Sequence, residues 1–136
     1  MVTTVSPQTN EKTRKVFCID DHPVAQKMLA KACHSFDATI HSNPMTATEA
    51  IIEGGHQVIV LDIVMPGVSG LEIIQNLQRA GHPCICIILS GHVNSDYAEE
   101  ALSSGLVWKY HIKPIDLVKL QTTISEAFEI FAQRYS

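Results

Sequence analysis

Five polar residues lie where short apolar segments of this sequence end. Asp20 and Asp21 follow the first such segment, Asp62 the third and Ser90 the fourth, and Lys113 comes just after the fifth. Carboxylates that lie close together repel one another, so a site that contains them needs a cation to offset the repulsion. Oxygen ligands are those that Mg²⁺ prefers, and lysine and serine can each contact a phosphate oxygen. The residue types therefore predict a magnesium-dependent phosphoryl-transfer site.

One of the three aspartates could act as the nucleophile, because a carboxylate can attack phosphorus to form an acyl phosphate. Asp62 fits this role best, since it ends the most apolar central segment, where a single side chain is held rigidly. Asp20 and Asp21 are adjacent, so their side chains diverge, which suits metal binding directly and through water. Taken singly, each aspartate is more often a turn residue or a helix cap. Their joint placement is what favours a site.

The sequence alternates five apolar segments with five helical patterns. The segments have the composition of β-strands, and they cover 15–20, 38–42, 57–63, 84–90 and 107–112. The helical patterns begin at Pro23, at Asn43-Pro44, after Ser69-Gly70, after Asn94 or Ser95, and at Pro114. Four segments are almost continuously apolar, as strands covered on both faces must be. The more polar segment 38–42 is expected at a sheet edge.

This alternation of strands and helices predicts an α/β fold. Right-handed crossovers place the strands in a five-stranded parallel sheet, doubly wound as (βα)5, with helices on both faces in a three-layer sandwich. Ligand chemistry in such sheets gathers at the carboxyl ends of the strands. All five residues of the candidate site are expected at such ends.

The composition describes one globular domain. Residues 1–13 are polar and lack the apolar centre of a secretory signal, so we expect a flexible tail ahead of a domain at 14–136. No apolar run approaches the ~20 residues of a membrane-spanning helix. These features predict a cytoplasmic protein without membrane contact. The net charge is −4 and basic residues are scattered, which argues against direct nucleic-acid binding by this domain.

The cysteines and histidines show no metal-binding motif. Cys18, Cys33, Cys84 and Cys86 include no CxxC pair. Cys84 and Cys86 point the same way along an extended segment that is too stretched to bridge comfortably, so free thiols are predicted. The seven histidines lack HxxxH and HExxH spacing, which argues against a zinc site.

From about Lys15 to its end, the chain resembles the receiver domain of bacterial two-component response regulators. Four segments carry this resemblance, and they are CIDDHP at 18–23, LDIVMPGVSG at 61–70, ILSG at 88–91 and YHIKP at 110–114. The DxxMPxxxG element is the most specific of them. The resemblance implies the CheY-like version of the flavodoxin-like fold, and a signalling domain rather than an enzyme, whose only chemistry is its own phosphorylation and dephosphorylation.

The resemblance also implies a role for each site residue. Asp62 would accept the phosphoryl group from a phosphohistidine on a sensor histidine kinase or a phosphotransfer protein. Asp21 would bind Mg²⁺ directly and Asp20 mainly through water, with Asp62 and the backbone carbonyl of Val64 as further ligands.

A conformational switch follows from the same resemblance. Lys113 would pair with the phosphate, Ser90 would swing toward it, and Tyr110 would turn inward behind Ser90. These movements would reshape the surface formed by the helix at 96–105, the strand at 107–112 and the last helix. From the residues alone, a core role for Tyr110 is favoured, because a single aromatic in a strand is usually buried.

Three kinds of partner could receive the signal of this switch. The form GLVWKYHIKP at 105–114 is similar to receivers joined to cyclic-di-GMP phosphodiesterase domains, so an output domain after Ser136 is one expectation. A separate target protein is another, and pairing of two receivers through the last helix is a third.

Two other functions compete with the switch. A hydrolase of the haloacid-dehalogenase kind also uses an aspartate nucleophile, but it needs a second aspartate two residues later as general acid, where this chain has Val64. A receiver-shaped binding module that is never phosphorylated is the second alternative, and the intact acidic residues and Lys113 argue against it. A dinucleotide-binding domain is excluded because DDHPVA, rather than a glycine-rich loop, follows the first strand.

Overall fold

We analysed a computed structural model that describes residues 14–91, 96–103 and 105–135. The tail expected at 1–13 lies outside the described residues. So do Asn94 and Ser95, one of which is predicted to cap the fourth helix.

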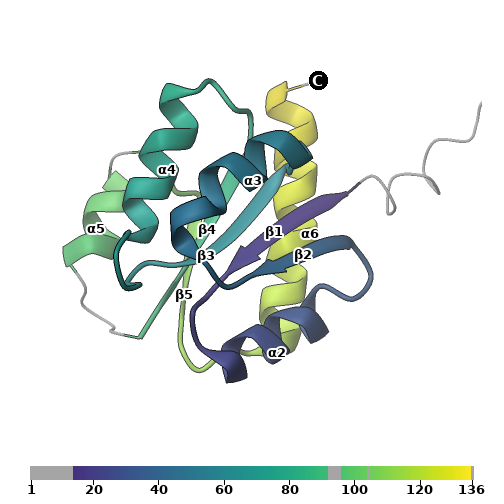
Figure 1. Cartoon of the computed structure of the whole chain (residues 1–136). Coiled ribbons are helices and arrows are strands. Elements are labelled where there is room, and N and C mark those ends of the chain that lie inside the picture. The colour runs from purple at the N-terminus through teal and green to yellow at the C-terminus, as the bar shows by residue number, and fades with distance from the viewer. Residues whose placement is uncertain (1–13, 92–95, 104, 136) are drawn as a thin grey trace, which may run out of the picture.

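Five parallel strands form one sheet in the order β2-β1-β3-β4-β5 (Figure 1). The strands are β1 (Lys15–Ile19), β2 (Asp37–His41), β3 (Val58–Asp62), β4 (Ile85–Ser90) and β5 (Lys109–Ile112). Every residue of β3 and β4 is buried, as expected for central strands covered on both faces. The outer strands β2 and β5 contain no fully buried residue. The prediction that the most polar strand lies at an edge is confirmed.

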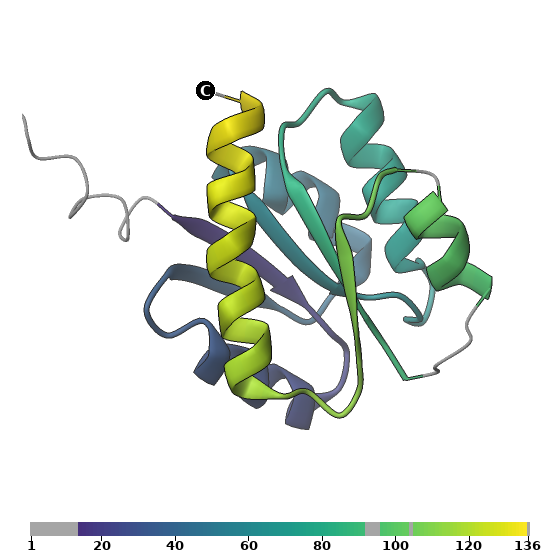
Figure 2. The same ribbon diagram turned by 180° about the vertical axis from the view of Figure 1, so that it is seen from behind.

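Helices cover both faces of this sheet. They are α2 (Pro23–Ala32), the 3₁₀ turn η2 (Pro44–Thr46) with α3 (Ala47–Gly54), α4 (Gly70–Arg79), α5 (Asp96–Ser103) and α6 (Leu117–Tyr135). Figures 1 and 2 show α2 and α6 on one face and α3, α4 and α5 on the other. The three-layer α/β fold is therefore confirmed.

Alternate residues of each strand feed two separate cores. Phe17 and Ile19 of β1 pack with the α3 and α4 side, whereas Val16 and Cys18 pack with α2 and α6. This alternation follows from the two-residue period of a strand. The apolar stripe expected on the last helix enters the second core at Leu120, Ile124 and Phe128, with Leu117 and Phe131 partly buried beside it.

The helix starts agree with the sequence in three cases and differ in one. The first of these helices, α2, begins at Pro23 as predicted. The Ser69 Oγ accepts the Glu72 N–H at 3.1 Å, and the Asn43 Oδ1 accepts the Met45 N–H at 3.0 Å. The prediction that Pro114 opens the last helix is wrong, because α6 begins at Leu117. The cap is Asp116, whose Oδ1 accepts the Lys119 N–H and whose carbonyl accepts the Leu120 N–H. Pro114 instead belongs to the loop that carries Lys113.

The four cysteines are free thiols, as predicted. The Cys84 and Cys86 sulfurs lie 3.9 Å apart and form a weak hydrogen bond, not a disulfide. The structure adds a contact that the sequence did not indicate, since the buried Cys18 and Cys33 sulfurs approach to 3.5 Å. Among the described residues, no helix combines the length and the apolar character needed to cross a bilayer.

Candidate functional site

The structure brings the predicted site residues to one edge of the sheet. Asp20 directly follows β1, Asp62 ends β3, Ser90 ends β4 and Lys113 directly follows β5. The strands are parallel, so their carboxyl ends meet at the same edge. Neighbouring strands with matched register bring these ends level, as in the pairing of Asp62 with Leu89 and of Ser90 with Ile112.

Lys113 is the cation at the centre of the site. Its Nζ lies 2.7 Å from the Asp20 Oδ2 and 3.1 Å from the Asp62 Oδ2. Burial by itself would lower the pKa of the Lys113 ammonium. The hydrogen bonds and charges of the two carboxylates raise this pKa by more than burial lowers it, so the pKa lies above its ordinary value of 10.5. One positive charge therefore stands between two buried negative ones.

Asp62 is a buried carboxylate with incomplete compensation. Asp62 is 5% exposed, and its Oδ1 accepts the Val64 N–H at 3.2 Å. Burial raises the pKa of Asp62 above its ordinary value of 3.8, and the hydrogen bond and charge of Lys113 offset only part of this effect. A second cation nearby would lower the free energy of the ionised form.

Four side chains could hold that cation. One ligand atom from each of Asp20, Asp21, His22 and Asp62 lies within 4.8 Å of every other. The Asp20 Oδ2 and Asp21 Oδ1 are buried and accept no hydrogen bond of ordinary geometry among the described residues. The Lys113 Nζ lies 2.7 Å from the Asp20 Oδ2, and the His22 Nδ1 lies 3.2 Å from the Asp21 Oδ1. Buried carboxylate oxygens of this kind fit a hard divalent ion such as Mg²⁺.

His22 is the member of this group that sequence reasoning missed. It precedes the first residue of α2, and its Nδ1 lies 3.2 Å from both the Asp20 Oδ1 and the Asp21 Oδ1. Its own backbone N–H also donates to the Asp20 Oδ1 at 3.0 Å. The sequence feature that could have identified His22 is its position directly after two aspartates. A search for HxxxH or HExxH spacing does not detect this feature.

Gly70 has a packing role beyond the helix start that the sequence indicates. A Cβ at this position would lie 2.5 Å from the Asp62 carbonyl oxygen and 3.0 Å from the Ile63 Cα. The Gly70 N–H donates to the Ile63 carbonyl at 2.9 Å. The start of α4 therefore sits directly against the backbone that carries Asp62, and only glycine permits this approach.

Ser90 and Tyr110 occupy different environments. Ser90 is 1% exposed, and its carbonyl accepts the Lys113 N–H at 2.7 Å, which ties the end of β4 to the lysine loop. Tyr110 is half-buried, faces Ile88 across the sheet register and packs against the core on the α3 and α4 side. This packing supports a core role for Tyr110, and its role as a switch stays a prediction. The role of the Val64 carbonyl as a metal ligand also stays a prediction.

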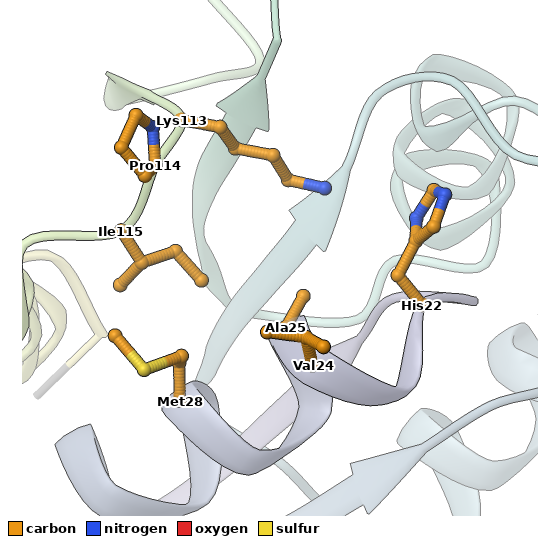
Figure 3. Close-up of a pocket in the computed structure, with 7 residues that line it drawn as sticks. All are labelled: His22, Val24, Ala25, Met28, Lys113, Pro114 and Ile115. Atoms are coloured by element: carbon orange, nitrogen blue, oxygen red, sulfur yellow. The ribbon is translucent and has the colours of Figure 1, made fainter.

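An apolar cavity of about 420 Å³ adjoins the acidic residues. Figure 3 shows its walls, which come from the first turns of α2 and from the loop after β5. Val24, Met28 and Ile115 are among its apolar lining residues, and His22 and Lys113 stand at its polar side. The side chain of Val24 is well exposed on this surface.

Comparison with known proteins supports one family. The model of the response regulator receiver domain matches residues 16–125. The transcriptional regulatory protein ZraR of Klebsiella oxytoca is 32% identical over 92 residues, which are 68% of this chain and 20% of that protein. The transcriptional regulatory protein YkoG of Bacillus subtilis is 26% identical over 118 residues, 86% of this chain and 51% of that protein. The chain thus spans about half or less of these curated relatives.

Solved structures agree on the fold. The signal receiver domain of a LuxO repressor protein from Vibrio parahaemolyticus superposes with a TM-score of 0.81 at 20% identity, covering 89% of this chain and 94% of that one. The curated relatives are transcriptional regulatory proteins, which contrasts with the cyclic-di-GMP phosphodiesterase output expected from GLVWKYHIKP. The matched family model covers most of the described residues and all five residues of the candidate site. This chain belongs to the response regulator receiver domain family.

Proposed function

We propose that this domain is a phosphorylation-dependent switch in which Asp62 accepts the phosphoryl group. The donor would be a phosphohistidine on a sensor histidine kinase or a phosphotransfer protein. Asp20, Asp21, Asp62 and the Val64 carbonyl would hold Mg²⁺, and Lys113 and Ser90 would contact the phosphate. The domain would have no enzymatic activity beyond its own phosphorylation and dephosphorylation.

The observation that carries this proposal is the environment of Asp62. Its carboxylate is buried at the end of a central strand, 3.1 Å from the Lys113 Nζ and within 4.8 Å of the other acidic side chains. Such an arrangement costs free energy in the resting protein, since burial opposes the charge of Asp62. A dianionic phosphate and a divalent cation together would complete the charge balance.

The transfer itself would use few groups. An Asp62 oxygen attacks phosphorus, the bond from phosphorus to the donor imidazole nitrogen breaks, and the histidine leaves as a neutral imidazole after it takes a proton. Lys113 is already aimed at the Asp62 oxygen and would follow the negative charge onto the phosphoryl group. Bound Mg²⁺ supplies charge neutralisation and positioning for the phosphoryl oxygens.

The proposed readout is a population shift at the surface of α5, β5 and α6. Phosphate would favour the conformation in which Ser90 contacts it and Tyr110 turns inward, and a partner would bind that conformation more tightly. The link of the Ser90 carbonyl to the Lys113 N–H supports a coupling between the ends of β4 and β5. An output in transcriptional regulation, through an attached domain or a separate target, fits the curated relatives. A cytoplasmic location and pairing of two receivers belong to the same proposal.

The test is labelling by acetyl phosphate, followed by intact mass spectrometry. Wild-type protein should gain one phosphoryl group with Mg²⁺ and none with EDTA. Asp62→Ala should remain unlabelled, whereas Asp37→Ala, which removes an exposed acid on the edge strand, should be labelled like wild type.

Each alternative predicts a different result. Release of phosphate far above one equivalent would favour an aspartate-nucleophile hydrolase. Such an enzyme needs a general acid at position 64, where this chain has the exposed, apolar Val64. An unlabelled wild-type protein whose amide NMR shifts ignore Mg²⁺ and beryllofluoride would favour a binding module that is never phosphorylated. Equal labelling of Asp62→Ala would remove the proposed role of Asp62.

A further inference from the structure

His22 adds a nitrogen donor to a site whose other candidate ligands are oxygens. Its side chain is 67% exposed, and its Nδ1 lies 3.2 Å from one oxygen of Asp20 and 3.2 Å from one oxygen of Asp21. Figure 3 shows its ring rising from the start of α2, on the side toward which the Lys113 side chain extends. The three donor atoms thus form a compact face at the edge of the acidic cluster.

The dimensions of this face fit an octahedral metal ion. Ligand atoms at about 2.1 Å from a metal and at right angles to each other are separated by about 3.0 Å. Two of the three sides of the His22, Asp20 and Asp21 triangle measure 3.2 Å. The third side joins the two carboxylates, so small rotations of the Asp20 and Asp21 side chains together with the exposed His22 ring would be needed to bring all three atoms to bonding distance.

Lys113 leaves the face formed by His22, Asp20 and Asp21 available, because it contacts a different oxygen of Asp20. It pairs with the Oδ2 of Asp20, whereas the Oδ1 of the same residue faces His22. The His22 N–H donates to that Oδ1 at 3.0 Å and so orients it. Asp62 likewise presents its Oδ2 to Lys113. The lysine and the proposed metal would use different oxygens of Asp20.

We propose that His22 is a metal ligand through its Nδ1 and that it gives the site a preference for a transition-metal divalent ion such as Co²⁺ over Mg²⁺. Imidazole binds first-row transition ions well, whereas Mg²⁺ prefers oxygen ligands and retains water. Metal binding at Nδ1 leaves the ring proton on Nε2. The inference rests on the proposed function, because both use the same acidic cluster. It extends that function by stating which divalent metal ion the cluster prefers.

The test measures the affinities of Co²⁺ and Mg²⁺ by titration calorimetry for wild type, His22→Gln and His34→Gln. Glutamine keeps an oxygen donor at position 22 but removes the imidazole, and His34 is an exposed histidine outside the acidic cluster. We expect His22→Gln to weaken Co²⁺ binding by at least about tenfold, since even groups that only orient a ligand contribute 10–100-fold. Mg²⁺ affinity should change much less, and His34→Gln should match wild type.

A second readout requires no substitution at position 22. In Co²⁺-loaded wild type, proton NMR should show a strongly shifted carbon-bound ring-proton resonance from a metal-bound histidine, and this resonance should persist in His34→Gln. Its absence, or unchanged Co²⁺ affinity in folded His22→Gln, would overturn the inference while Mg²⁺ binding and labelling of Asp62 leave the proposed function standing. If wild type binds neither ion, the proposed function fails as well.

Discussion

The Lys113 Nζ lies 3.1 Å from the Asp62 Oδ2, although 51 positions separate the two residues in the chain. The strands that carry them are not neighbours, since β4 runs between β3 and β5. The lysine therefore reaches across the end of β4, where its own N–H is held by the Ser90 carbonyl at 2.7 Å. A shift of β5 relative to β3 would change the charge environment of Asp62.

Removing the positive charge of Lys113 should destabilise the metal-free domain. In Lys113→Met, the buried Asp20 and Asp62 would face each other without a cation. We expect a loss of about 1–3 kcal/mol in the free energy of unfolding, less than the ~3–5 kcal/mol of fully buried pairs because the lysine side chain is 21% exposed. Urea denaturation measures it.

Added Mg²⁺ should recover more stability in Lys113→Met than in wild type, because a bound ligand stabilises the folded state and the vacated charge favours a cation. Lys27→Met removes an exposed lysine on α2 and serves as the control. Equal stability of Lys113→Met and Lys27→Met without Mg²⁺ would contradict the assigned charge balance.

Neutralising Asp62 should stabilise the metal-free domain at neutral pH. Burial raises the pKa of this carboxyl above 3.8, so its contribution to stability is full below that pH and is lost as the pH rises through the higher folded value. Asp62→Asn is neutral throughout, and we expect a gain of about 0.5–2 kcal/mol at pH 7, the range typical of single stabilising substitutions.

The gain in Asp62→Asn should shrink as the pH falls toward 3.8, where wild-type Asp62 becomes protonated. Chemical denaturation at several pH values without Mg²⁺ provides the measurement, with Asp37→Asn at the exposed sheet edge as the comparison. A less stable Asp62→Asn at pH 7 would mean that the Lys113 pair outweighs burial.

A methyl group at position 70 should disturb Asp62 through its backbone. In Gly70→Ala the new Cβ would meet the Asp62 carbonyl oxygen at 2.5 Å, so β3 or α4 must move. Overpacking of this kind costs about 1–3 kcal/mol. We expect lower stability together with slower labelling by acetyl phosphate. Gly91→Ala is the matched control, since a Cβ there has open space; equal labelling rates for both variants would reject the constraint.

Mild acid should weaken the fold through His56. This histidine is 5% exposed, its Nδ1 contacts the Ile51 carbonyl at 3.3 Å and its Nε2 contacts the Thr39 hydroxyl at 3.2 Å. Burial lowers the pKa of His56 below 6.5. The unfolded chain then binds the proton first, so stability is full above pH 6.5 and falls with pH from there through the lowered folded pKa.

His56→Gln should reduce the slope of stability against pH below 6.5, by at most about 1.4 kcal/mol per pH unit for one proton. The unfolding free energies of wild type and variant at pH 7.5 and 5.5 give this slope, with the exposed His34→Gln as the reference. Identical slopes for His56→Gln and wild type would show that other groups, such as His111, whose pKa burial also lowers, carry the effect.

The amino-acid sequence by itself determined the α/β class, the edge position of β2 and the placement of Asp20, Asp62, Ser90 and Lys113 at strand ends. Apolar runs and polar breaks are local signals, because continuous burial of a strand requires an unbroken apolar segment. Parallel pairing then forces all carboxyl ends to one edge, so a common site followed without knowledge of the strand order.

Only the tertiary structure decided which atoms meet at that edge. The place of β4 between β3 and β5 depends on strand order, and the approach of Gly70 to the Asp62 carbonyl depends on how α4 packs against the end of β3. The contact of His22 with two carboxylates is local in the chain, but it depends on the backbone path between β1 and α2. The start of α6 at Leu117 depended on a side-chain cap at Asp116 rather than on Pro114. Contacts between distant segments leave no periodic trace in a chain, since each segment is compatible with several neighbours until the sheet assembles.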